Sequence, residues 1–250
     1  MTSPSRTRVV CMTSAKGGIG QSTISLDWAR AVGRQGRRCL LIELAGGDLA
    51  WQVGATPEQF AEEVASGTVT LDTAAVRIDD HVSLLASGNA WSIYGPDRPD
   101  EVAALVRRIT AGRWEHAIID LGNASRAIAL AALAAVHRRV ILLEDTVASV
   151  ARTYALLRAL GDGVLADNTA LVFNRIDNST DAKSLLERFS QLTSRFLNRT
   201  WPLLGTVPDG ASEVRVQAIA EWGTADVPGP AETPASIKGG ISNRPFWADN

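Results

Sequence analysis

One stretch decides the fold of this chain, Ser14-Ala15-Lys16-Gly17-Gly18-Ile19-Gly20-Gln21-Ser22-Thr23. An apolar run over residues 8–12 predicts a strand before it, and the pattern over residues 22–35 predicts a helix after it. Glycines let the backbone curl until successive N–H groups point at one anion, and the start of a helix adds partial positive charge. The stretch therefore predicts a phosphate-binding loop. The alternative, glycines that only form a tight turn, agrees less well with this strand–loop–helix context.

Short apolar runs alternate with longer helical patterns along the rest of the chain. Further strands are expected at 39–42, 82–85, 117–119, 140–143, 170–173 and 203–204, and helices at 57–66, 99–112, 124–136, 147–161, 181–197 and 211–221. Continuous apolar runs are typical of strands that are covered on both faces. The order predicts an α/β fold with a doubly wound, mostly parallel sheet and helices on both faces. We expect one domain over residues 1–223, followed by a Pro/Gly/Ser-rich tail over 224–250.

The composition excludes several classes of protein. Of 250 residues, 46% are hydrophobic and 21% charged, which is typical of a globular chain and excludes wholesale disorder. Lys and Arg number 25 against 27 Asp and Glu, and this acidic balance argues against general affinity for nucleic acid. Cys11 and Cys39 lie in apolar runs and are expected to be buried free thiols. With no targeting signal or membrane-spanning run in the sequence, we expect a cytoplasmic protein.

A second candidate site residue is Asp120, which ends the apolar run at 117–119. A carboxylate at a strand end next to a phosphate loop suits contact with Mg²⁺ through water, and Gly122 permits the backbone to swing there. The alternative is an ordinary helix N-cap or a solvated strand end. Trp51 and Trp91 lie in poorly periodic segments, where an exposed aromatic residue would suit a partner interface and a buried one would be packing. The basic run at 137–139 is most simply a set of solvated or sheet-edge charges.

The pattern Lys-Gly-Gly-x-Gly-x-Ser-Thr resembles the deviant Walker A loop of the MinD/ParA family of dimerising ATPases. The resemblance implies ATP and Mg²⁺ as cofactors and a homodimer with nucleotide between its subunits. Lys16 holds the place of the signature lysine, which is expected to reach the partner subunit's phosphates. Ser22 and Asp120 are expected to act on Mg²⁺. The resemblance places the remaining binding residues on the nucleotide as follows: Gly17, Gly18, Ile19, Gly20, Gln21, Ser22 and Thr23 on the phosphates, Asn174 on the adenine ring and Pro208 near it.

Two departures from the family pattern predict weak or absent hydrolysis. Gln21 stands where the family has a second lysine, and losing a charge-assisted contact typically costs about 1.5–3 kcal/mol. After the second strand the family has an Asp-x-Asp pattern, in which the second acid orients the attacking water. Here Glu43 takes the first place and Ala45 the second, and Asp48 comes three residues too late unless the loop shifts. The catalytic candidates are therefore Lys16, Glu43 and Asp48.

The altered loop and the stretch at 79–87 resemble the CpaE/TadZ pilus-assembly and BcsQ cellulose-secretion subgroup. We therefore expect an ATP-binding, dimeric spatial organiser or assembly factor of a cell-envelope secretion system. Its partners would be proteins of that machine, with indirect contact to the inner membrane or cell pole. Two alternatives stay open: an active ATPase for plasmid or chromosome partition or cell-division placement, and a nucleotide-free pseudo-ATPase scaffold. DNA binding is not favoured.

Overall fold

Eight strands form one sheet in the part of the chain that this computed structural model describes, residues 7–45, 48–88, 90–91, 98–136, 138–164 and 168–209. The strands are β1 (Arg8–Ser14), β2 (Cys39–Glu43), β3 (Val76–Arg77), β4 (Val82–Leu85), β5 (His116–Asp120), β6 (Arg138–Leu143), β7 (Thr169–Asn174) and β8 (Leu203–Val207). Their order is β3-β4-β2-β5-β1-β6-β7-β8, and every neighbouring pair is parallel except β3 and β4. The predicted α/β fold with a mostly parallel sheet is confirmed.

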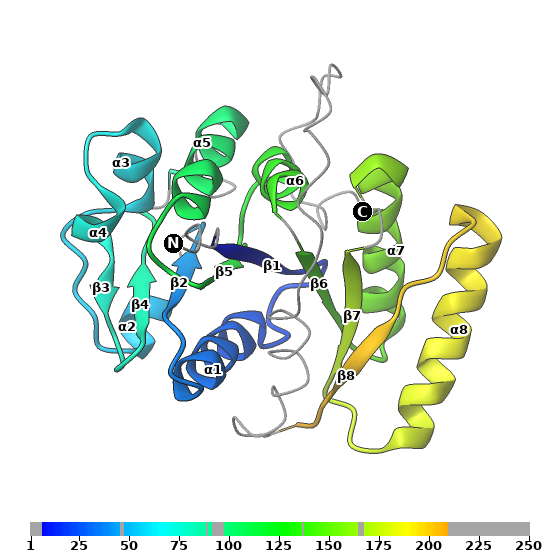
Figure 1. Cartoon of the computed structure of the whole chain (residues 1–250). Helices are drawn as coiled ribbons and strands as arrows, with labels where there is room; N and C mark the ends of the chain where they lie inside the picture. Colours follow the sequence, from blue (N-terminus) through cyan, green and yellow to red (C-terminus); the bar gives the residue numbers. More distant parts are fainter. Residues whose placement is uncertain are drawn as a thin grey trace, which may run out of the picture.

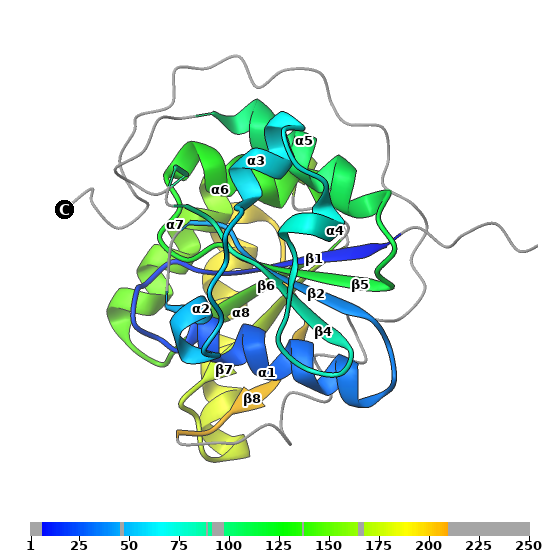
Figure 2. The same ribbon diagram turned by 90° about the vertical axis from the view of Figure 1, so that its left-hand side faces the viewer.

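Helices cover both faces of this sheet (Figures 1 and 2). They are α1 (Gln21–Arg34), α2 (Leu49–Gln52), α3 (Ala61–Ser66), α4 (Leu71–Ala74), α5 (Pro99–Thr110), α6 (Arg126–Ala135), α7 (Val147–Val164) and α8 (Ser179–Leu197). Helix α1 lies on one face, and α3, α5 and α6 lie on the other (Figure 1). Helix α7 contains a kink at Gly161, whose φ of 65° and ψ of 173° are not helical. None of the described helices is long and apolar enough to cross a bilayer.

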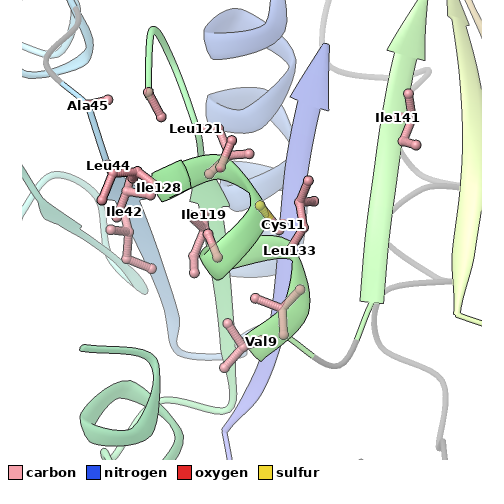
Figure 3. Close-up of a cluster of buried hydrophobic side chains, with 14 of the residues drawn as sticks. Val9, Cys11, Ile42, Leu44, Ala45, Ile119, Leu121, Ile128, Leu133 and Ile141 are labelled. Carbon is pink, nitrogen blue, oxygen red and sulfur yellow. The ribbon is translucent and has the colours of Figure 1, made fainter. Parts of the chain in front are cut away.

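Successive side chains of the central strands point to opposite faces of the sheet and so contribute to two hydrophobic clusters, one on each face. Val9 and Cys11 of β1 pack with α6, whereas Val10 and Met12 pack on the α1 side. Figure 3 shows the first set, with Val9 and Cys11 beside Ile119 of β5. Because both faces of β1 are buried, its sequence reads as an unbroken apolar run.

Several expectations on individual elements need correction. The helix expected at 57–66 begins at Ala61, and the short elements α2, α4 and β3 were not predicted. Arg138 and Arg139 are not solvated or sheet-edge charges: each is only 7% exposed, in a strand that lies between β1 and β7. Trp91 is buried, whereas Trp51 is 84% exposed. The helix expected at 211–221, the boundary at 223 and the tail lie outside the described residues.

Candidate functional site

The candidate site lies beyond the carboxyl ends of the central parallel strands. From β1 the chain passes through α1 to β2 on one side of the sheet, and later fills the other side with β6, β7 and β8. Strand β1 is thus the point at which the winding reverses, and open α/β sheets bind ligands at such a point. The loop that follows β1 is the glycine-rich stretch at 14–23. The predicted phosphate loop is therefore placed where the fold favours a ligand.

The glycines give this loop a conformation that other residues would adopt only with strain. Gly18 has a φ of +74° and Gly20 a φ of +80°, both in the left-handed region. A Cβ atom on Gly20 would lie 3.3 Å from Nδ2 of Asn174, so the two segments approach closely. Gly17 and Gly18 are exposed, whereas Ile19 is buried and anchors the loop. Helix α1 starts at Gln21, so its free N–H groups point toward the loop.

Gln21 is buried and turns its side chain toward the ends of the strands. Its Oε1 accepts a hydrogen bond of 2.8 Å from Oγ of Ser14, and its Nε2 donates to the carbonyl oxygen of Met12 at 3.3 Å. The same Nε2 donates to Oδ1 of Asp120. The side chain that replaces the family's second lysine thus makes all these hydrogen bonds inside the protein.

Asp120 and Ser22, the two residues expected to act on Mg²⁺, are hydrogen-bonded to each other. Asp120 is only 1% exposed, and its carboxylate accepts hydrogen bonds from Ser22, Gln21 and the N–H of Gly122. Burial raises the pKa of Asp120, and these three hydrogen bonds oppose that rise. A hydroxyl and a carboxylate are oxygen ligands of the kind that Mg²⁺ prefers, so the pair fits the cation. The Oδ1 atom of this carboxylate also accepts the hydrogen bond from Nε2 of Gln21.

The two other predicted acids differ in their distance from this pair: Glu43 lies opposite Asp120 on the neighbouring strand, and Asp48 lies at the start of α2. Glu43 is buried, and its Oε1 accepts a hydrogen bond of 3.0 Å from the N–H of Leu49, which fixes the start of α2. Burial raises the pKa of Glu43, the hydrogen bond from Leu49 opposes that rise, and the neighbouring charges of Asp120 and Asp48 add to it. Asp48 is exposed at the start of α2, where its side chain caps no N–H group. Ala45 is buried and brings no acid.

Lys16 is bound to an acid that the sequence analysis did not single out. Glu144 directly follows β6, is 5% exposed, and places Oε2 2.7 Å from Nζ of Lys16. Its Oε1 lies 2.7 Å from Nη1 of Arg175, which follows β7. Arg175 also donates from Nη2 to the carbonyl oxygen of Gly18 at 3.2 Å. The sequence held one signal for Glu144 and Arg175: each directly follows an apolar strand. Asp120 stands in a similar place, as the last residue of its strand.

The last two predicted residues close the other side of the loop. Asn174 ends β7, is buried, and donates from Nδ2 to the carbonyl oxygen of Ile19. Pro208 is buried directly after β8, and Val207 pairs with Asn174 in the sheet. Thr23 is exposed in the first turn of α1. The structure therefore brings the ends of β7 and β8 to the phosphate loop.

Comparison with known proteins decides the family. Residues 10–216 match the CobQ/CobB/MinD/ParA nucleotide binding domain. The chain belongs to this family. The family that the glycine-rich loop predicts is thereby confirmed.

Relatives of the chain have diverged far from it in sequence. Antiactivator FleN of Pseudomonas aeruginosa is 21% identical over 207 residues, which are 80% of this chain and 73% of FleN. A cobyrinic acid a,c-diamide synthase from Mycobacterium smegmatis, with bound ADP and magnesium, is 26% identical with a TM-score of 0.65, over 86% of this chain and 91% of that one. The MinC:MinD cell division complex of Aquifex aeolicus gives 18% identity and a TM-score of 0.63, over 90% and 98%. These relatives support the family and its fold without separating the subgroups within it.

Proposed function

We propose that this chain binds ATP with Mg²⁺ at the phosphate loop, pairs face to face with a second copy, and hydrolyses the nucleotide slowly or not at all. One observation carries the proposal: Gln21 is hydrogen-bonded to Asp120 and brings no charge to a loop that is otherwise built for phosphate. The ADP and magnesium in the Mycobacterium smegmatis synthase support the choice of cofactors.

The residues that would hold the nucleotide are those of the loop and its neighbours. Backbone N–H groups of residues 17–23 and the start of α1 would bind phosphate, and Ser22 and Asp120 would act on Mg²⁺. When bound, the cation neutralises charge that develops on the phosphates. Asn174 and Pro208 would border the base from the ends of β7 and β8.

Slow hydrolysis follows from the acids around the loop. Hydrolysis needs a group that orients the attacking water. Glu43 accepts a hydrogen bond from the N–H of Leu49, Ala45 has no carboxylate, and Asp48 is exposed at the residue before α2. Position 21 itself supplies no cation, because Gln21 is neutral. The proposal therefore describes a protein that works through its bound state rather than through turnover.

A face-to-face dimer is supported by what lies around the loop. Trp51 is 84% exposed and Val147 is 88% exposed. They lie in α2 and at the start of α7, on the side of the sheet where β1 runs into α1 (Figure 2). Exposed large apolar side chains around a binding site suit a partner surface. We propose that a second copy covers them and that Lys16 reaches across to its phosphates.

The process served is proposed to be the spatial organisation or assembly of a cell-envelope secretion system of the pilus or cellulose type. The altered loop and residues 79–87 support this subgroup. The MinC:MinD complex and the antiactivator FleN support a role exerted through a protein partner. Contact with the inner membrane or cell pole would then pass through those partners.

Capture of the tagged chain from its own cells is expected to recover subunits of such a machine. Recovery of DNA in a salt-sensitive complex would instead support the partition alternative.

Phosphate release tests the catalytic part of the proposal. We expect steady-state release by the wild type, with saturating ATP and Mg²⁺, to stay close to that of Ser22→Ala. Release far above that control would show an active ATPase.

Sedimentation of the wild type and Lys16→Ala with and without ATP tests the dimer. A dimer that ignores both ATP and the substitution would show a nucleotide-free scaffold instead.

A further inference from the structure

We propose that Glu144 holds the two cations of the phosphate loop, Lys16 and Arg175, and that nucleotide phosphates must take these cations from it. The proposal rests on the nucleotide binding proposed above. It assigns Arg175 as a phosphate-binding residue and Glu144 as the positioning residue that competes with the ligand.

The geometry joins the three side chains into one unit. Each carboxylate oxygen of Glu144 lies 2.7 Å from one cation, Oε2 from Nζ of Lys16 and Oε1 from Nη1 of Arg175. The N–H of Glu144 donates to Oγ of Ser149 at 3.0 Å, which fixes the backbone behind the carboxylate. Because Glu144 is buried, these ion pairs are screened less than surface pairs are. The acid is therefore a strong competitor for both cations.

Arg175 is placed to serve the loop directly. Its Nη2 donates to the carbonyl oxygen of Gly18 at 3.2 Å, so the guanidinium lies beside the exposed glycines. The backbone φ of Arg175 is +56°, in the left-handed region, which residues other than glycine adopt only at a cost in free energy. Its side chain is 47% exposed, which leaves it open to an approaching ligand. A guanidinium in this position can bind phosphate through two N–H groups.

The charges around the loop predict how Glu144 affects the affinity for nucleotide. Gln21 is neutral, so Lys16 and Arg175 are the cations that the described residues place on the loop. The buried carboxylate of Glu144 neutralises part of the charge of both, and the exposed carboxylate of Asp209 lies 3.7 Å from Nε of Arg175. Phosphate brings more negative charge than a single carboxylate and can displace that of Glu144. Removing the negative charge of Glu144 should therefore strengthen nucleotide binding, the opposite of what loss of a binding residue does.

The experiment compares four proteins by calorimetric titration with Mg²⁺-ATP and with Mg²⁺-pyrophosphate. They are the wild type, Glu144→Gln, Arg175→Gln and the matched control Asp145→Asn. Asp145 is the next residue along, but its carboxylate binds Nη2 of Arg188 on α8 at 2.9 Å. We expect Glu144→Gln to bind both ligands about tenfold more tightly and Arg175→Gln about tenfold more weakly. Asp145→Asn should match the wild type. Thermal unfolding checks that each variant is folded.

The outcomes separate this inference from the proposed function. Binding by Glu144→Gln that is equal to or weaker than that of the wild type overturns the competition. Binding by Glu144→Gln alone, with a silent wild type, supports it and shows that Glu144 keeps the loop closed to nucleotide. No binding by any of the four proteins overturns the inference together with the proposed function. Binding by the wild type with no effect of either substitution leaves the proposed function standing and overturns the inference.

Discussion

At the scale of single residues, the phosphate loop differs from its family most at Gln21. A lysine at this place would carry its charge to the phosphates, whereas the amide of Gln21 bridges Ser14, Met12 and Asp120 below the loop. The buried carboxylate of Asp120 thereby gains a hydrogen bond that needs no cation. The loop keeps its backbone shape, which its glycines impose, while it loses a charge.

Restoring that charge should restore affinity. We expect Gln21→Lys to bind Mg²⁺-ATP about 10- to 100-fold more tightly than the wild type, because a charge-assisted contact replaces a neutral one. Phosphate release should rise much less, since Ala45 still supplies no acid. Calorimetry and a phosphate assay on the same preparation check both parts. An equal affinity in Gln21→Lys and the wild type would show that position 21 does not face the ligand.

His116 gives the folded state a pH dependence of known sign. The pKa of His116 falls from 6.5 to about 4, mainly because the ring is buried and in smaller part because Arg37 and Arg8 are positively charged. Between these two values the unfolded chain binds a proton that the folded chain does not. The free energy of unfolding should therefore fall as pH falls from about 6.5 to about 4.

Urea unfolding across this range tests the effect against His116→Gln. Burial raises the pKa of Asp120 and Glu43, and a raised pKa gives the opposite slope, so the variant is needed to isolate the histidine. We expect a shallower loss of stability with falling pH in His116→Gln. Parallel curves for the two proteins would contradict the assignment.

The sequence predicts the residues of the loop better than it predicts their partners. Glycines, Ser22 and Asp120 could be found because each stands in a local pattern beside a strand. Glu144 also directly follows a strand, but its bond to Lys16 could not be predicted, because that bond spans 128 positions and depends on how β6 lies beside β1. Gln21 could be recognised as a replacement, but its hydrogen bond to Asp120 spans 99 positions. Such pairs follow from the sheet order and not from spacing.

At the scale of elements, β6 begins with two arginines that the structure buries. The guanidinium of Arg139 donates to the carbonyl oxygens of Leu133 and Val136 at the end of α6. These carbonyls are among those that a helix leaves without an internal partner. The guanidinium of Arg139 therefore caps the C-terminal end of α6. The interpretation of this basic run as surface charge did not predict that contact.

Removing this closure should destabilise the fold. We expect Arg139→Leu to lower the free energy of unfolding by about 2 kcal/mol, because it leaves buried carbonyl groups without donors. Arg113→Ala is the matched control: it breaks an exposed ion pair with Asp72, in which both side chains are 61% exposed, and should cost under about 1 kcal/mol. Urea unfolding compares the two. A similar small loss in both would show that water or another group serves the end of α6.

Elements were predicted well where they are long and apolar. The central strands were found because both of their faces are buried, so each reads as a continuous run. Elements α2, α4 and β3 have only 4, 4 and 2 residues, too few to show a period. The start of α2 depends on Glu43, which accepts a hydrogen bond from Leu49. That contact is not visible in the pattern of either residue.

At the scale of the whole molecule, exposed apolar side chains divide between two edges of the sheet. Trp51 and Val147 lie at the carboxyl edge beside the phosphate loop. Phe196 is 57% exposed and lies near the end of α8, which precedes β8 and so belongs to the amino edge. Among the described residues, the exposed apolar groups at the carboxyl edge lie beside the phosphate loop, so this is the face on which we place the second copy.

This division supplies a test of the dimer. We expect Trp51→Ser to weaken ATP-dependent dimerisation at least tenfold, because a central aromatic residue often dominates an interface. Phe196→Ser should leave dimerisation unchanged. Sedimentation velocity with and without Mg²⁺-ATP measures both. Equal weakening in the two variants, or in neither, would contradict the placement of the second copy at the carboxyl edge.

The alternation of strands and helices was enough to predict the architecture of the molecule, because a parallel sheet needs crossover helices. The process that the protein serves does not follow from the same physics. Partners contact surface residues, and the relatives of this chain include both a MinD in complex with MinC and the antiactivator FleN.

The central claim is that the loop still binds nucleotide although Gln21 replaces lysine. Calorimetric titration with Mg²⁺-ATP, on the wild type and Gly20→Val, tests it most directly. A Cβ at Gly20 would crowd Asn174 and strain a φ of +80°, so Ser22→Ala serves as a second variant if the valine does not fold. We predict saturable binding by the wild type that Gly20→Val abolishes and Ser22→Ala weakens. A folded wild type that shows no binding at millimolar ATP would contradict the claim.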